Sequence, residues 1–353
     1  MKKNWLNNFH RIKSENFDRS NFLRLDKNER IIDFNKIFLK HLKKKLDTFE
    51  IASNPNIEKI NQLLAKDLKI SKDSICLTAG SDFALRMCFE FFSKQKDKII
   101  TLNPTFGMVE VYTKIFGLKN IQIGYDRNLN LDIDKLFKNL KKNISMVIIA
   151  NPNSPTGTII KPDILKKIIV KTYKLKIPLV IDEAYYGFYN FSCLNYIKKY
   201  NNLVILRTFS KAYGLAGLRS GFIIANKKIA KNLFKFKPMY EINSISCIAI
   251  EFLIKNKKII NNHISHIKES KSYLIKELKN INYDYINTYG NFFHIDLKKN
   301  KKKFENILKK NKILVRKGPG VRGFDDYIRF SLGSIVQMKK IIKLIKSIKP
   351  IKH

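Results

Sequence analysis

Short apolar runs alternate with helix-length segments between about residue 50 and residue 250, and this alternation constrains the fold more than any other feature of the chain. Each run is five or six residues long and is bounded by turn residues. The runs cover 74–78, 98–102, 121–125, 145–150, 178–182, 203–208 and 221–225. Strands that are apolar on both faces and separated by helices predict a mostly parallel sheet with helices packed on both sides.

The pattern changes after Lys231. Amphipathic helical periodicity runs over roughly 244–280, and alternating segments follow at 291–297 and 326–332. These elements predict a second, smaller α+β domain that the N-terminal residues complete. We therefore expect an α/β fold with a large domain over 46–240 and a small domain built from 1–45 and 241–353.

The chain is strongly basic. Its 353 residues carry a formal net charge of +40, and eleven of the 69 basic residues are arginine. A cationic surface suits nucleic acids and membranes, but here the lysines are spread along the whole chain, whereas a phosphate-binding patch favours clustered arginine. We expect no specific nucleic-acid partner. The competing hypothesis is a nucleic-acid-binding protein built on a degenerate enzyme scaffold.

The cysteines and the N-terminal residues bear on the compartment. The four cysteines show no C-x-x-C spacing, so we expect neither a metal site nor a disulfide framework, and a reducing cytoplasm fits best. The first residues are basic but lack an apolar run behind them, so no secretory signal is expected. No stretch approaches 18 uninterrupted apolar residues, so no membrane span is expected either.

Polar and aromatic residues follow the carboxyl ends of the apolar runs, where ligands bind in parallel sheets. They are Ser81, Asp82, Phe106, Asn153, Ser154, Asp182, Tyr185, Thr208, Ser210, Lys211 and Arg219. Each alone is compatible with an ordinary cap or turn. Together they match one cofactor, pyridoxal phosphate: a lysine can form a Schiff base with its carbonyl, an aspartate can pair with its ring nitrogen, and the helix that begins near Gly80 can hold its phosphate.

Four segments carry a resemblance to a known family. "AGSD" (79–82), "NPNSPTG" (151–157), "IDEAYYGF" (181–188) and "TFSKAYGLAGLRSGF" (208–222) occur in the order typical of fold-type-I, pyridoxal-phosphate-dependent aminotransferases. Within that family the chain resembles the histidinol-phosphate aminotransferases. The resemblance extends from "LRLDKNE" near the start to "YIRFSLGS" near the end.

The resemblance implies a role for each of these residues. Lys211 would hold the cofactor covalently, Asp182 would bind its ring nitrogen, and Phe106 would stack on its ring. Tyr185 and Asn153 would bind the ring hydroxyl. The phosphate would be bound by Ser81, Asp82, Thr208, Ser210 and Arg219, and the substrate's anionic groups by Arg316 and Arg329. Three residues depart from the family pattern. Ser154 stands where an asparagine is common, Phe49 where relatives carry a tyrosine that reaches the neighbouring subunit's cofactor, and Arg30 where a substrate-pocket segment continues with Pro or Tyr.

The composition of the chain supports a functional role for some of the arginines. In a chain that prefers lysine about five to one, a retained arginine is expected where its planar fork must bind a phosphate or a carboxylate. The implied activity is that of a cytoplasmic, homodimeric aminotransferase of histidine biosynthesis, which moves an amino group between glutamate/2-oxoglutarate and histidinol phosphate. The alternatives are another phosphorylated amine as substrate, or decarboxylation of an O-phospho amino acid.

Overall fold

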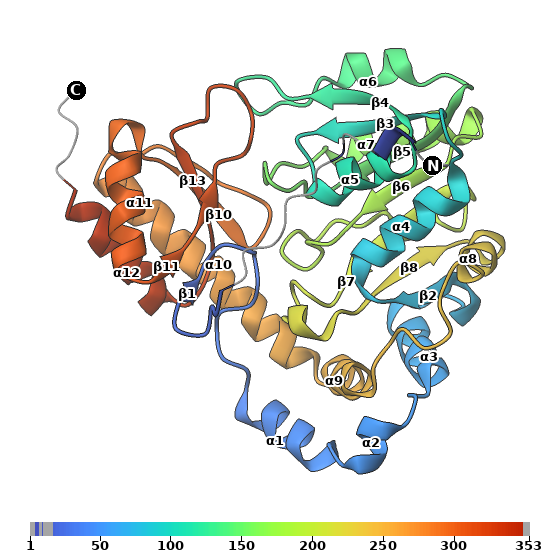
Figure 1. Ribbon diagram of the computed structural model, residues 1–353, viewed down its shortest axis with the longest axis horizontal. Coiled ribbons are helices and arrows are strands. Elements are labelled where there is room, and N and C mark those ends of the chain that lie inside the picture. The colour runs from blue at the N-terminus through green and yellow to red at the C-terminus, as the bar shows by residue number, and fades with distance from the viewer. Residues whose placement is uncertain (1–3, 7–8, 10–16, 349–353) are drawn as a thin grey trace.

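A seven-stranded sheet forms the centre of the larger part of the molecule (Figure 1). The computed structural model describes residues 4–6, 9 and 17–348; the other residues at the ends of the predicted small domain lie outside it. The strands are β2 (Ile75–Thr78), β3 (Lys98–Asn103), β4 (Lys119–Gly124), β5 (Ile144–Ala150), β6 (Leu179–Asp182), β7 (Leu203–Thr208) and β8 (Gly221–Ala225). Their order is β2-β8-β7-β6-β5-β3-β4, and only β8 runs antiparallel to its neighbours. The predicted, mostly parallel sheet is confirmed.

The central strands β5, β6 and β7 are buried on both faces of this sheet, which explains why they are mainly apolar, whereas the edge strand β4 is polar at several positions and buries only Ile123. Along β5, Val147 and Ile149 enter one core while Met146 and Ile148 enter the other. The first core is covered by α1 (Lys36–Lys45), α3 (Ile57–Leu68), α6 (Ile133–Asn139), α7 (Pro162–Lys174) and α9 (Ser244–Lys255), and the second by α4 (Gly80–Phe92), α5 (Gly107–Ile115) and α8 (Lys227–Phe234). The short helix α2 (Thr48–Ala52) buries no side chain.

A second, smaller sheet has its own core. Four antiparallel strands form it in the order β12 (Arg316–Lys317), β13 (Tyr327–Ser331), β10 (Phe292–Asp296) and β9 (Tyr285–Ile286). Beside it, β1 (Leu23–Arg24) pairs in parallel with β11 (Ile313–Leu314). The helices here are α10 (Lys257–Asn280), α11 (Lys301–Lys310) and α12 (Ile335–Lys346), in the orange and red part of Figure 1.

The packing divides the chain differently from the predicted domain boundaries at 45/46 and 240/241. Phe38 of α1 and Ile250 of α9 belong to the core of the large sheet, although both residues fall in the predicted small domain. The helices expected over 244–280 are α9 and α10, which meet at Asn256. Helix α10 then joins the two parts, because Ile260 lies in the large core and Ile267 in the small one.

Three features concern the whole described chain. All four cysteines are buried and unpaired. Within residues 4–6, 9 and 17–348, no helix combines the length and the apolar character needed to cross a bilayer. The same residues contain no cluster of three or more His, Cys, Asp or Glu side chains placed to hold a metal ion.

The contact between Gly157 and Thr288 lies where the two parts of the molecule meet, and it provides a test of this packing. Gly157 has φ of +76°, and a Cβ there would overlap the Thr288 side chain. We expect Gly157→Ala to lower the free energy of unfolding by about 2–4 kcal/mol, because the backbone is left-handed and Thr288 has to move. Gly124→Ala is the control, since a Cβ there meets nothing within 4 Å. Urea unfolding of both variants measures the difference, and equal stability would contradict this account.

Candidate active site

A cavity of about 790 Å³ opens at the carboxyl ends of the parallel strands. Eleven of the twelve residues predicted to bind cofactor or substrate line it: Ser81, Asp82, Phe106, Asp182, Tyr185, Thr208, Ser210, Lys211, Arg219, Arg316 and Arg329. Strand geometry explains their convergence. Asp182 and Thr208 end the neighbouring parallel strands β6 and β7, and Lys211 follows three residues after β7. We call this space the front cavity.

Asp182 is a buried carboxylate without a cation. Its Oδ1 accepts a hydrogen bond of 2.9 Å from the Ala184 N–H, and among the described residues it forms no ion pair. Burial raises the pKa of Asp182 to about 7, and the Glu183 carboxylate adds to this effect, while Lys211 opposes it. A carboxylate in this position is stabilised by any positively charged N–H that enters the cavity.

The first turn of α4 lies close to the loop before β8 at one corner of the front cavity. Gly80 has φ of +86°, and a Cβ on it would lie 3.2 Å from Arg219 Nη2. A Cβ on Gly221 would lie 2.6 Å from the Ser81 backbone nitrogen. The two glycines therefore allow a guanidinium and a helix N-terminus to approach one another, a combination that binds phosphate. Asp82 accepts a hydrogen bond from Tyr112, so it has only its backbone N–H to offer an anion.

Lys211 and Tyr185 meet at Asn28, a residue for which sequence reasoning assigned no role. The Lys211 ammonium donates to the carbonyl oxygens of Lys27 (3.1 Å) and Asn28 (3.0 Å). The Asn28 side-chain amide donates to the Tyr185 hydroxyl at 2.8 Å. Asn28 is buried with φ of +53°, and the Ser331 hydroxyl accepts from its backbone N–H. Its position in the conspicuous "LDKNE" segment is the only signal in the sequence that points to it.

Two arginines from the smaller sheet also line the front cavity. Arg316 and Arg329 are cross-strand neighbours on β12 and β13. Neither forms an ion pair with a carboxylate in the part of the chain that the structure describes; the Arg329 Nη2 donates to the Asp26 carbonyl oxygen, and its Nε is buried without a partner. Burial lowers the pKa of Arg329. Two adjacent guanidinium groups without acidic partners form a site for an anion.

The other residues that the sequence analysis singled out, apart from Ser154, do not line the front cavity. Asn153 does not line the front cavity: its amide donates to the Pro104 carbonyl oxygen and to Thr156, while Ser154 lines the cavity instead. Arg30 does not line it either, because its guanidinium donates to the carbonyl oxygens of residues 32 and 33. Phe49 is 70% exposed on α2 and lies outside this cavity.

The front cavity fits pyridoxal 5′-phosphate. The buried, unpaired Asp182 carboxylate suits a protonated pyridine nitrogen, and the corner at Gly80 and Arg219 suits the phosphate. Phe106, which is 39% exposed, presents an aromatic ring at the cavity. Lys211 provides an amine in the same cavity.

Comparisons with known proteins agree with this geometry. Residues 20–348 match the family model described as "Aminotransferase class I and II". A histidinol-phosphate aminotransferase from Clostridium novyi is 35% identical over 333 residues, which cover 92% of this chain and 91% of the relative. The structure of the histidinol-phosphate aminotransferase from Clostridium acetobutylicum superimposes with a TM-score of 0.82 at 24% identity, covering 92% of this chain and 98% of that one. A histidinol-phosphate aminotransferase from Sinorhizobium meliloti, solved in complex with pyridoxal 5′-phosphate, gives 0.81 at 20% identity, covering 92% and 91%.

The chain belongs to the class I and II aminotransferases. It has their fold-type-I architecture, it is an enzyme, and its cofactor is pyridoxal 5′-phosphate.

The environment of Asp182 leads to a test of cofactor-free stability. The folded protein binds the Asp182 proton more tightly than the unfolded chain, so stability falls as pH rises from about 4 to about 7. Above pH 7 we expect cofactor-free Asp182→Asn to be more stable than the parent by on the order of 2 kcal/mol, with the difference shrinking towards pH 4. We expect pyridoxal phosphate to reverse the order, because only the carboxylate can gain a cationic partner from the cofactor. Urea unfolding at pH 4 and pH 8 measures this; equal stability of the two cofactor-free proteins at pH 8 would contradict it.

Proposed function

We propose that the protein is a histidinol-phosphate aminotransferase, which transfers the amino group of histidinol phosphate to 2-oxoglutarate and forms glutamate. One observation carries the proposal: an amine, a buried carboxylate and two arginines that form no ion pair with a described carboxylate all line the same cavity. The names of relatives that are 30–35% identical over most of the chain support the same substrate.

Pyridoxal phosphate, when bound, supplies a carbonyl that condenses with amines and a ring that accepts electrons from the substrate carbon. The chain's own residues then do the rest. Asp182 would keep the pyridine nitrogen protonated, and Tyr185, whose hydroxyl accepts a hydrogen bond from Asn28, would donate its own proton in a hydrogen bond to the ring oxygen. Lys211 moves a proton on and off the substrate carbon as general base and acid.

The two arginines orient the substrate. Arg329 is half-buried and is held by its hydrogen bond to the Asp26 carbonyl oxygen, whereas Arg316 is exposed. We assign Arg329 and Arg316 to the substrate phosphate when histidinol phosphate is bound, and to a carboxylate when glutamate is bound. A phosphate and a carboxylate both present anionic oxygens that a guanidinium binds in a bidentate way, so one pair of arginines can serve both halves of the reaction.

The proposal includes the assembly and the location. We propose a homodimer in which Phe49 of one subunit lies beside the other subunit's cavity; support comes from the exposed apolar side chains of this region, Ile37, Phe49, Ile51, Met239 and Tyr240. A cytoplasmic location is supported by four buried cysteines that form no disulfide. The proposal also includes the roles of Asp182, Tyr185 and Lys211 towards the cofactor and of Arg316 and Arg329 towards the substrate.

A coupled assay tests the function. Purified protein reconstituted with pyridoxal phosphate is mixed with L-histidinol phosphate and 2-oxoglutarate, and glutamate is measured. We expect glutamate to form without release of carbon dioxide, and Arg329→Lys to raise the KM for both substrates by about tenfold or more, because an ammonium cannot reproduce a bidentate contact. Lys302→Arg, on the exposed surface of α11, is the control with no expected effect.

Two results would overturn the assignment. Carbon dioxide released from an O-phospho amino acid, with no glutamate formed from histidinol phosphate, would identify a decarboxylase. Faster turnover of a different phosphorylated amine would leave an aminotransferase but replace its substrate.

A further inference from the structure

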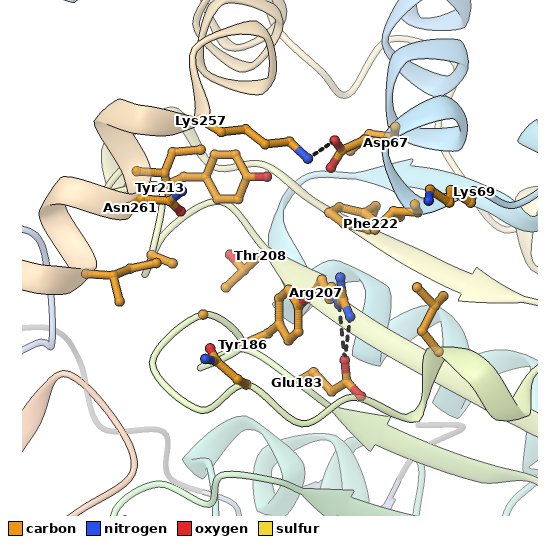
Figure 2. A pocket seen from close by; sticks show the side chains of 18 of the residues that line it. Asp67, Lys69, Glu183, Tyr186, Arg207, Thr208, Tyr213, Phe222, Lys257 and Asn261 are labelled. Atoms are coloured by element: carbon orange, nitrogen blue, oxygen red, sulfur yellow. Dashed lines mark hydrogen bonds and ion pairs between the residues drawn. The ribbon is translucent and has the colours of Figure 1, made fainter.

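A second cavity lies on the α3 side of the large sheet, where α10 begins (Figure 2). Its volume is about 530 Å³, and no step of the proposed reaction uses it. Its apolar wall, which includes Leu64, Phe222 and Ile260, belongs to the first core. We call this space the rear cavity.

A buried ion pair forms the floor of the rear cavity. Arg207 Nη2 lies 3.0 Å from Glu183 Oε2, with the two side chains only 6% and 2% exposed. Glu183 also accepts hydrogen bonds from the Ser192 hydroxyl and the Cys193 N–H, so its charge is fully compensated. The Arg207 guanidinium lies 3.6 Å from the centre of the Tyr186 ring. The floor is therefore electrically neutral, and it is built from two planar groups.

The rim of the cavity is positively charged. Lys257 pairs with Asp67 at one side, as Figure 2 shows. Lys69 and Lys268, which also line the cavity, have no ion-pair partner within the described residues. Since the floor pair and the Asp67 pair are each neutral, these two lysines give the cavity a net positive charge, which favours an anion.

Tyr213 adds a hydrogen-bond donor among the apolar groups. Its side chain extends from the loop after Lys211 into the rear cavity (Figure 2), and its hydroxyl has no hydrogen bond with any described residue. Burial raises the pKa of Tyr213 to about 12, so the hydroxyl keeps its proton at neutral pH. An apolar wall, an aromatic face and a few polar groups around a net positive charge suit a small ring that carries a carboxylate.

The rear and front cavities share a wall. Asp182 lines the front cavity and the next residue, Glu183, lines the rear one; Lys211 and Tyr213 are divided in the same way, and Thr208 lines both. A ligand that fixes the rear side chains therefore also restrains the backbone that carries the front ones.

We propose that the rear cavity binds a small aromatic or heteroaromatic carboxylate and that its occupation changes the affinity of the front cavity for cofactor. By thermodynamic linkage, the cofactor changes the affinity for the rear ligand by the same factor. The proposal goes beyond the transamination proposed above and does not depend on it, since its tests measure binding.

Benzoate and imidazole-4-carboxylate are the probes. Isothermal titration calorimetry of the holoprotein measures their affinity, with acetate as the control without a ring and benzamide as the control without a charge. We expect both probes to bind at least about tenfold more tightly than either control. Hydrogen–deuterium exchange should show protection by the probes in segments 207–213 and 257–268.

Matched charge variants locate the site. The double variant Lys69→Glu with Lys268→Glu should weaken benzoate binding at least about tenfold. Lys302→Glu with Lys303→Glu makes the same change in net charge on the exposed surface of α11, and it should leave binding unchanged. Saturating benzoate should change the dissociation constant of pyridoxal phosphate about fivefold or more. Absence of binding, equal loss in the two double variants, or protection confined to segment 316–331 would refute the rear site; an unchanged cofactor dissociation constant would refute its coupling to the front cavity.

Discussion

A carboxylate buried without a cation is the constraint around which the front cavity is arranged. Asp182 ends β6, the middle strand of the seven, so neighbouring strands separate it from solvent on both sides. Such a group is costly in the folded protein unless a positive charge joins it. The fold provides an opening beside it, which Lys211 and Arg219 also line, and in the proposed complex the cofactor's ring nitrogen would supply the missing charge. On this proposal, the burial of Asp182 lowers the stability of the cofactor-free protein and strengthens the binding of the cofactor's ring nitrogen.

The two parts of the molecule meet at this opening, and Asn28 lies where they meet. Its main chain is held by the Ser331 hydroxyl and the Asn291 amide of the smaller part, while its side chain and carbonyl oxygen contact Tyr185 and Lys211 of the larger part. A shift of one part relative to the other therefore changes the hydrogen bonds of both reactive groups. Helix α10 makes a second connection, because it contributes to both hydrophobic cores.

The sequence predicts the sheet and the position of the cavity well, because both follow from local patterns. Each of the seven apolar runs overlaps a strand, and polar groups at parallel strand ends have to converge. Long-range packing is harder to predict: α1 and α9 are amphipathic or apolar helices whose sequences do not say which core they join. The same holds for Asn153, because its role in the turn depends on Pro104, a residue 49 positions away. Asn28 and the rear cavity arise only when three or more separate segments come together.

The central claim is that one particular lysine among 58 reacts with the cofactor. Borohydride reduction of the protein reconstituted with pyridoxal phosphate, followed by peptide mass spectrometry, tests it most directly, because reduction makes the link permanent. The account predicts one phosphopyridoxyl group per chain, on the peptide that contains Lys211, and none in the Lys211→Ala variant. A label on another lysine, or an equal scatter over many surface lysines in both proteins, would contradict it.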